Sequence, residues 1–186
     1  MTNRPAAGTN QIGFIGLGTM GRRLAARLLG GGCSLLVYDR VPDAVARVVA
    51  LGGAAIGLTS ADDVLAACEV VFTSLPAPDD VSATYVRGAV AADAIGAGQV
   101  LVDLSTIDPT TSRRLAAAVA RRGASFLDAP VSGGLRGAEA GTLTVMVGGA
   151  AAALDRVRPL LATFSERVVH VGPSGTGSAM KLANQL

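Results

Sequence analysis

Short runs of apolar and β-branched residues alternate along this chain with longer segments whose apolar residues recur every three or four positions. Short runs of this kind predict buried strands. Five of them occupy residues 11–15, 34–39, 69–74, 99–104 and 125–128. Because strand and helix alternate, the pattern predicts an α/β fold with a doubly wound, mostly parallel sheet that carries helices on both faces.

The segments between the strands carry helical signals. Met20, Leu24 and Leu28 recur at four-residue spacing, with arginines on the opposite side. Residues typical of helix ends support further helices. They are Pro42 and Gly52 at the two ends of a second helix, Ser60 with Asp63 in a capping box, and Asp108 with Pro109 ahead of a helix that runs to Gly123. Beyond these, strands at 143–147 and 167–171 and a helix at 150–161 are expected to extend the same sheet.

Composition and charge narrow the class of protein. Half of the residues are hydrophobic and 16% are charged, which predicts a packed globule. A net charge of +2 and scattered arginine pairs, each expected on a solvated helix face, exclude a nucleic-acid surface. The polar N-terminus lacks the apolar core of a signal peptide, and no run reaches the roughly 18 apolar residues of a membrane span. We therefore expect a cytoplasmic protein without membrane or nucleic-acid partners.

The two cysteines, Cys33 and Cys68, lack the spacing of a metal or redox motif. They are expected to be buried thiols, and we predict no metal site. The single histidine, His170, lies in an apolar strand without an acidic or nucleophilic partner in a motif, so a hydrolase triad is not indicated.

A glycine-rich turn follows the first predicted strand. Gly16-Leu17-Gly18-Thr19-Met20-Gly21 matches the GxGxxG fingerprint of dinucleotide-binding Rossmann domains. The three glycines permit a tight turn, backbone approach to a pyrophosphate, and close packing of helix on strand. The phosphates would then lie at the positive end of the helix, so these six residues are the predicted cofactor contacts.

Asp39 lies at the end of the second strand, where an acidic residue binds the ribose hydroxyls of a dinucleotide. Its carboxylate favours NAD, because it would repel the 2′-phosphate of NADP. Arg40 beside it could pair with that phosphate. The pattern favours NAD and leaves NADP open.

Three further segments resemble the β-hydroxyacid dehydrogenase family, which includes 3-hydroxyisobutyrate dehydrogenase and tartronate semialdehyde reductase. Residues 13–21 resemble that family's fingerprint, residues 128–134 with 141–149 its substrate-binding segment, and residues 175–184 its catalytic-lysine motif. The resemblance also implies cofactor contacts at Leu75 and Pro76 and a nicotinamide-side contact at Thr106. For Thr106, capping of the following helix is an equal alternative.

Lys181 is the only lysine in the chain. Oxidation of an alcohol needs a base for the hydroxyl proton, and reduction needs an acid. Arginine stays protonated at any working pH, whereas a lysine can serve if burial and a neighbouring cation lower its pKa. Lys181 is therefore the candidate catalytic acid/base.

Ser132, Gly133 and Gly134 offer a hydroxyl and exposed backbone N–H groups that can bind a carboxylate, although Ser-Gly-Gly is also ordinary turn chemistry. Asn184 lies one helical turn after Lys181. The resemblance implies that Asn184 orients the lysine or the substrate, a role that Gln185 could share.

The chain departs from the family pattern in two places. Arg22, Arg23 and Arg27 occupy a stretch where members often carry Pro and Asn, which we expect to affect helix detail more than chemistry. Family proteins also continue beyond the lysine helix into a helical domain that closes the site and forms a dimer. We therefore expect a dinucleotide-binding domain at residues 1–175, the start of the lysine helix at 176–186, a homodimer where the helical domain is present, and an unburied apolar face on the lysine helix.

These observations predict an NAD(P)-dependent oxidoreductase that acts on a small 3-hydroxy acid or its semialdehyde. In this chain, cofactor binding should survive better than turnover, because a pocket open to water weakens electrostatic tuning. An imine reductase is one alternative, and a non-catalytic dinucleotide-binding module is another.

Overall fold

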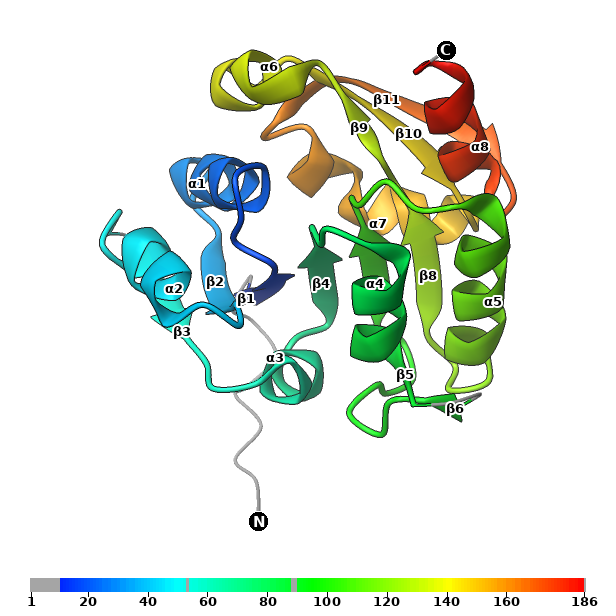
Figure 1. Cartoon of the computed structure of the whole chain (residues 1–186), viewed down its shortest axis with the longest axis horizontal. Coiled ribbons are helices and arrows are strands. Elements are labelled where there is room, and N and C mark those ends of the chain that lie inside the picture. The colour runs from blue at the N-terminus through cyan, green and yellow to red at the C-terminus, as the bar shows by residue number, and fades with distance from the viewer. Residues whose placement is uncertain (1–10, 53, 88–89, 186) are drawn as a thin grey trace.

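The computed structural model describes residues 11–52, 54–87 and 90–185, so the polar N-terminal stretch at 1–10 lies outside the described residues. Figure 1 shows a central sheet flanked by helices. The strands are β1 Gln11–Ile15, β2 Ser34–Tyr38, β3 Ala55–Gly57, β4 Val70–Thr73, β5 Val86–Arg87, β6 Val90–Ala91, β7 Val100–Asp103, β8 Ser125–Asp128, β9 Val131–Ser132, β10 Leu143–Gly148 and β11 Ser165–Gly172. The helices are α1 Gly21–Gly30, α2 Pro42–Val49, α3 Ala61–Ala67, α4 Pro78–Tyr85, α5 Pro109–Ala120, α6 Gly134–Ala140, α7 Ala151–Leu161 and α8 Thr176–Ala183.

The main sheet runs in the order β11-β10-β8-β7-β4-β1-β2-β3, and β9 pairs with β10. Neighbouring strands are parallel except where β10 pairs with β8 and β9. The two late strands extend the same sheet, as predicted, and β5 and β6 form a separate antiparallel pair. The predicted doubly wound, mostly parallel fold is confirmed.

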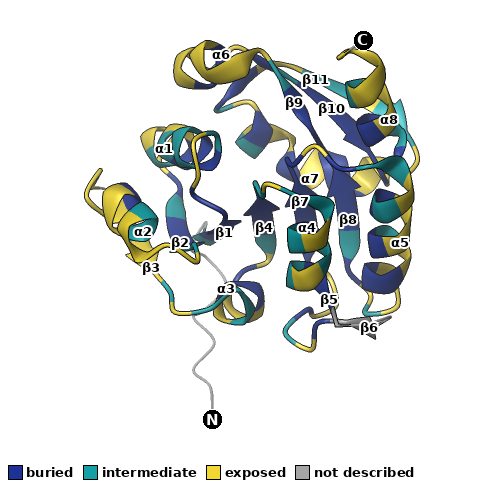
Figure 2. Ribbon diagram, in the orientation of Figure 1, coloured by how far each residue is buried: buried dark blue, intermediate teal, exposed yellow. Residues whose placement is uncertain are grey.

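Alternate residues of each strand face opposite sides of the sheet, and each side has its own core. Phe14 belongs to the core that includes buried residues of α1, α2 and α7. Ile15, the next residue, belongs to the core under α3, α4 and α5. Figure 2 shows the inner strands largely buried between these two layers of helices, whereas the edge strands β3 and β11 are partly exposed. Both faces of the sheet are therefore covered, and its strand ends are left to form sites.

Two predicted helix starts are present. Asp108 caps α5, because its Oδ1 accepts from the Thr111 backbone N–H at 2.8 Å. Ser60 Oγ caps α3 by accepting from the Asp63 N–H at 3.1 Å. The Asp63 carboxylate accepts from Thr59 Oγ1 at 2.9 Å, and a backbone hydrogen bond from Ser60 also lowers its pKa, as a capping box requires.

The arginine pairs differ from the expectation of purely solvated helix faces. Arg121 and Arg122 follow α5 instead of lying on it. Arg23, with a side chain only 19% exposed, forms a 2.7 Å ion pair with Glu139 on α6 and donates to the Thr19 carbonyl at 2.6 Å. Arg27 Nε donates to the Thr163 carbonyl at 3.0 Å. Two of the three arginines that depart from the family pattern, Arg23 and Arg27, therefore tie α1 to the second half of the chain.

Several short elements had no counterpart in the sequence pattern: β3, β5, β6, β9, α4 and α6. Each spans two to eight residues, too few to establish a hydrophobic period. For α4 a local signal exists, since Pro78 in the first turn is followed by Asp79 and Asp80. The two missed helices matter because one flanks the cavity described below and the other follows Gly133.

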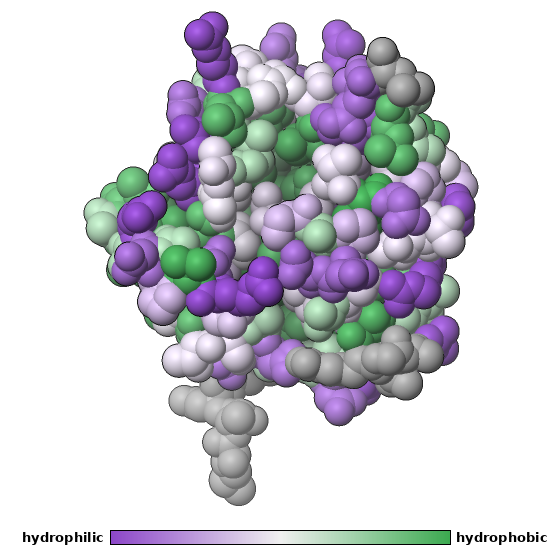
Figure 3. All heavy atoms as spheres, viewed as in Figure 1, coloured by the Kyte–Doolittle hydropathy of each residue, from purple (hydrophilic) through white to green (hydrophobic). Residues whose placement is uncertain are grey.

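Apolar side chains of α8 are unburied, since Met180 is 45% exposed and Leu182 is 41% exposed, although these two lie on different sides of the helix. Figure 3 shows hydrophobic atoms over α8 beside the C-terminal end of the chain. Cys33 and Cys68 are buried free thiols, and burial raises the pKa of Cys68 to about 12. Among the described residues, no helix is long and apolar enough to span a bilayer.

Candidate functional site

The turn between β1 and α1 is shaped by contacts that only glycine permits. Gly16 has a φ of +91°, and a Cβ on it would collide with the Ser74 carbonyl oxygen at the end of β4. A Cβ on Gly21 would collide with the carbonyl oxygen of Gly16 itself. The first and third glycines of the fingerprint are therefore required by the packing of the protein.

Gly18 differs from the other two glycines. A Cβ on Gly18 would find no atom within 4 Å. In the described part of the chain, the backbone N–H groups of residues 18–21 have no acceptor on the protein. The first turn of α1 also lacks an acidic side chain. Open space, unpaired donors and the positive end of a ten-residue helix together fit a bound pyrophosphate.

Asp39 holds the glycine turn against the end of β2. Its Oδ2 accepts from the Leu17 N–H at 2.6 Å, and its Oδ1 accepts from the Val41 N–H at 2.8 Å. A carboxylate offers about four acceptor positions, so capacity remains for ribose hydroxyls. Leu17 is 2% exposed and its N–H is occupied by Asp39. Its part in the turn is therefore packing and contact with Asp39.

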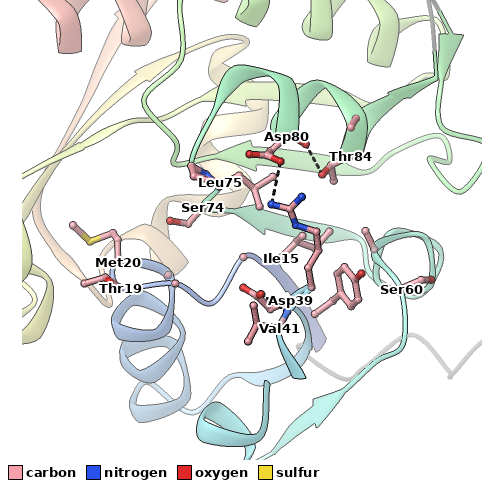
Figure 4. Close-up of a pocket in the computed structure, with 18 of the residues that line it drawn as sticks. Ile15, Thr19, Met20, Asp39, Val41, Ser60, Ser74, Leu75, Asp80 and Thr84 are labelled. Atoms are coloured by element: carbon pink, nitrogen blue, oxygen red, sulfur yellow. Dashed lines mark hydrogen bonds and ion pairs between the residues drawn. The ribbon is translucent and has the colours of Figure 1, made fainter. Parts of the chain in front are cut away.

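A cavity of about 680 Å³ opens beside the turn (Figure 4), a size typical of small-molecule sites. Its lining comes from the turn, the end of β2, the start of α3, the loop after β4, and α4. Nine residues predicted to contact a dinucleotide line it: Gly16, Gly18, Thr19, Met20, Gly21, Asp39, Arg40, Leu75 and Pro76. Leu17 and Thr106 are not among the lining residues.

The far wall of the cavity was missed by sequence reasoning. Asp80 on α4 lies opposite Asp39, and Arg40 Nη2 reaches across to Asp80 Oδ1 at 3.2 Å, the ion pair drawn in Figure 4. Asp62, at the start of α3, also lines the cavity. Three carboxylates and one arginine therefore surround the region next to Asp39.

The catalytic-lysine motif begins at a tightly fixed helix start. Asp128, the last residue of β8, accepts from the backbone N–H of Gly175 at 2.7 Å and of Ser178 at 2.8 Å. Burial raises the pKa of Asp128, and these two hydrogen bonds oppose the rise. A Cβ on Gly177 would collide with the Asp128 carbonyl, which explains the Gly-x-Gly spacing. The start of α8 is thus anchored at the carboxyl edge of the sheet.

The other end of α8 meets the predicted substrate segment. Asn184 Nδ2 donates to Ser132 Oγ at 3.1 Å. Gly133 and Gly134 follow at φ of +130° and +64° and lead into α6. Lys181 is half-buried on α8 and has no hydrogen-bond or ion-pair partner among residues 11–185 that are described. The structure therefore brings the serine of the substrate segment to the lysine helix.

Thr106 and His170 both lie outside the lining of the cavity. Asp108 caps α5, so the capping alternative for Thr106 is wrong, and Thr106 is exposed just beyond β7. His170 Nε2 lies 2.8 Å from the Gly149 carbonyl oxygen, a contact between strand and turn.

Comparison with known proteins agrees with this geometry. A 2-(hydroxymethyl)glutarate dehydrogenase of Eubacterium barkeri is 40% identical over 95% of this chain, and an NAD-dependent L-serine dehydrogenase of Pseudomonas aeruginosa is 44% identical over 94%. The chain spans 58% of the length of each of these two relatives.

Solved structures show the same fold. A Mycobacterium tuberculosis 3-hydroxyisobutyrate dehydrogenase with L-serine superposes with a TM-score of 0.86 at 37% identity, covering 95% of this chain and 59% of that one. A Streptomyces aurantiacus imine reductase superposes with a TM-score of 0.84 at 27% identity, covering 94% and 60%. The predicted resemblance to the β-hydroxyacid dehydrogenases is confirmed. A family profile described as the NAD binding domain of 6-phosphogluconate dehydrogenase matches residues 11–172, and the chain belongs to that family of NAD-binding domains.

Proposed function

We propose that this domain serves an NAD-dependent oxidoreductase that interconverts a small 3-hydroxy acid and its semialdehyde. The single observation that carries the proposal is the 3.1 Å contact between Asn184 Nδ2 and Ser132 Oγ. It joins the helix that bears the only lysine to the loop best suited to bind a carboxylate. The substrates named for the relatives, L-serine and 2-(hydroxymethyl)glutarate, each combine a hydroxymethyl group with a carboxylate one carbon away.

The dinucleotide would be held by the backbone of the glycine turn at its phosphates and by Asp39 at a ribose. When bound, it supplies the hydride acceptor for oxidation or the hydride donor for reduction. Cavity walls formed by the loop after β4 and by α4 would cover it on the other side.

Substrate recognition falls to the end of β9 and the turn that follows it. Asn184 donates to Ser132 Oγ, so the serine hydroxyl keeps its own proton for a substrate carboxylate. The positive φ values of Gly133 and Gly134 turn the chain sharply ahead of α6. Their N–H groups would add further donors to the same carboxylate.

Proton transfer falls to Lys181. Its amine would take the hydroxyl proton of the alcohol during oxidation and return it to the carbonyl oxygen during reduction. Asp128 positions this amine indirectly, because it fixes the first turn of α8 through Gly175 and Ser178. No other lysine is available in the sequence for this step.

The charges around the cavity support NAD over NADP. Asp39, Asp62 and Asp80 all line it, and Arg40 already pairs with Asp80. The three carboxylates would repel the 2′-phosphate of NADP, and the one arginine, Arg40, is already paired with Asp80.

The test is a pair of lysine variants, Lys181→Ala and Lys181→Arg. Arginine keeps the positive charge but does not exchange a proton at working pH. NAD affinity, measured by calorimetry, should stay within about twofold in both variants. Oxidation of L-serine and 3-hydroxyisobutyrate, followed at 340 nm, should fall by at least about a hundredfold in both, the range of general acid–base contributions. Turnover that survives in either variant would contradict the proposal.

An imine reductase has a specific observation in its favour, the similar fold of the Streptomyces enzyme. The same assay distinguishes it, because a cyclic imine in place of the hydroxy acid would then be the substrate. In that case neither the wild type nor the Lys181 variants would oxidise the hydroxy acids.

A further inference from the structure

Asp103 is the last residue of β7 and lies in the middle of the sheet, between β4 and β8. It is fully buried. Its Oδ1 accepts three hydrogen bonds, from Thr73 Oγ1 at 2.7 Å, from Ser105 Oγ at 2.6 Å and from the Ser105 N–H at 3.2 Å. One oxygen atom thus ties the end of β4 to Ser105, two residues beyond the end of β7.

The network extends beyond the carboxylate in both directions. Tyr85 on α4 donates its hydroxyl to Thr73 Oγ1 at 3.0 Å. The backbone N–H of Leu75 donates to Ser105 Oγ at 2.9 Å. Because both hydroxyls give their protons to Asp103, each is left to accept from its other neighbour. The Asp103 carboxylate therefore sets which group donates and which accepts in each hydrogen bond of this network.

The segments held in this way are those next to the cavity. Leu75 and Pro76 line the cavity, as does Ser74, while Ser105 leads to the exposed Thr106. Asp103 itself is not among the lining residues. It lies one residue layer behind the wall and fixes the backbone from which the wall is built.

We propose that Asp103 is a positioning residue for cofactor binding, which holds the loops after β4 and β7 in register through Ser105 and Thr73. The inference rests on the proposed function in one respect, namely that these loops contact the dinucleotide. It assigns Asp103 no contact with substrate or cofactor.

The electrostatics argue that Asp103 does more than fill space. Burial raises its pKa to about 6, the three hydrogen bonds oppose the rise, and the neighbouring carboxylate of Asp128 adds to it. Tyr85 is the other titratable group in the network, and burial raises its pKa well above the ordinary value. Asp103 Oδ2 is buried without a hydrogen-bond partner among the described residues. A buried charge with one unsatisfied oxygen lowers stability, so the packing of this strand does not by itself account for it.

The chain offers a matched control at the other end of the same strand. Gln99, just before β7, is also buried, and its Nε2 donates to the carbonyls of Leu65 and Cys68. Gln99→Ala removes a buried polar anchor of β7 that, like its partners Leu65 and Cys68, does not line the cavity. Asp103→Ala removes one beside it.

The experiment measures NAD binding by calorimetry and unfolding by urea in Asp103→Ala, Asp103→Asn, Ser105→Ala and Gln99→Ala. Asp103→Ala should raise the dissociation constant for NAD by about tenfold, and Asp103→Asn, which keeps one acceptor, by about threefold. Gln99→Ala should lose stability but keep its NAD affinity within about twofold. Ser105→Ala added to Asp103→Ala should weaken binding no further, because both break one connection.

Hydrogen exchange provides the readout if Asp103→Ala does not fold. In Asp103→Asn the amides of Leu75 and Ser105 should exchange faster than in the wild type, while those at the start of β7 keep their rates. Unchanged exchange at Leu75 and Ser105 would overturn the proposal. An NAD affinity that falls equally in the Gln99 and Asp103 variants, in step with stability, would overturn it too.

Failure of the proposed function looks different: Lys181 variants would keep their turnover while NAD affinity still fell in the Asp103 variants.

Discussion

Asn184 donates its amide proton to the hydroxyl oxygen of Ser132 at 3.1 Å, although 52 residues separate them in the chain. The contact closes a link from the sheet edge at Asp128, along α8, to the loop before α6. Both ends of the lysine helix are thereby tied down, one through its backbone and the other through a side chain. A helix fixed at both ends can present Lys181 with little freedom of orientation, which efficient proton transfer requires.

Asn184→Ala should therefore weaken substrate use without affecting the cofactor. Loss of the amide frees the Ser132 hydroxyl and the last turn of α8, so KM for L-serine should rise by about tenfold, the equivalent of one or two hydrogen bonds. Gln185→Ala is the matched control, since Gln185 is adjacent and also exposed. A larger effect in the Gln185 variant would show that the neighbouring amide, and not Asn184, holds this position.

Cofactor choice should shift when Asp80 is replaced. Asp80→Ala removes a carboxylate from the cavity and releases Arg40 for a 2′-phosphate. Affinity for NADP should increase by about fivefold, because an exposed ion pair is worth on the order of 1 kcal/mol at most. NAD affinity should change little. Asp79→Ala, on the same first turn of α4 but not lining the cavity, provides the comparison, and an equal gain there would contradict the role given to Asp80.

The sequence predicts the sheet and most of its ligand edge because those features depend on local patterns. Five apolar runs correspond to β1, β2, β4, β7 and β8, with boundaries that differ by at most one residue. Asp39 was found because the fingerprint fixes its distance from Gly16 along the chain. The candidates in the glycine turn and Asp39 were therefore accessible from motif spacing, whereas Leu75, Pro76 and Thr106 were predicted only from the family resemblance.

Other parts of the site depend on contacts between distant residues. Nothing in the sequence around Asp103 indicates that Thr73, Ser105 and Tyr85 converge on it, since these residues come from three elements that meet only in the folded sheet. The Arg23 ion pair with Glu139 is similar, because α6 is too short for its position to be inferred. Short elements carry little periodic signal, and tertiary packing decides where they lie.

The free energy of unfolding should depend on pH through Asp103. Its pKa rises from an ordinary 3.8 to about 6 in the folded chain, so the folded state binds more protons than the unfolded state between these values. Stability from this group is complete below about pH 4 and is lost as the pH rises through about 6. An asparagine does not titrate, so Asp103→Asn does not lose this part of the free energy of unfolding. Between pH 4 and pH 7 the variant should therefore gain up to about 3 kcal/mol of stability relative to the wild type.

Urea unfolding of both proteins at several pH values tests this expectation. Asp128 also has a raised pKa, whereas hydrogen bonds lower those of Asp63 and Asp108. These groups are present in both proteins, so the difference between the two curves reports Asp103 together with its electrostatic interaction with Asp128. A difference that does not vary with pH would show that Asp103 titrates at its ordinary value.

Gly18 and Gly21 should respond in opposite ways to the same substitution. Gly18→Ala places a methyl group in open space, at a backbone conformation that is not left-handed, so folding should be unaffected. The methyl group would, however, occupy the space in front of the unpaired N–H groups, and NAD affinity should fall by at least about tenfold. Gly21→Ala forces its methyl group into the carbonyl oxygen of Gly16 and should lower stability by about 3 kcal/mol. Calorimetric binding and thermal unfolding of the two variants separate the effects. If Gly18→Ala bound NAD normally, the phosphates would have to lie elsewhere, and the turn would be a packing feature without a ligand.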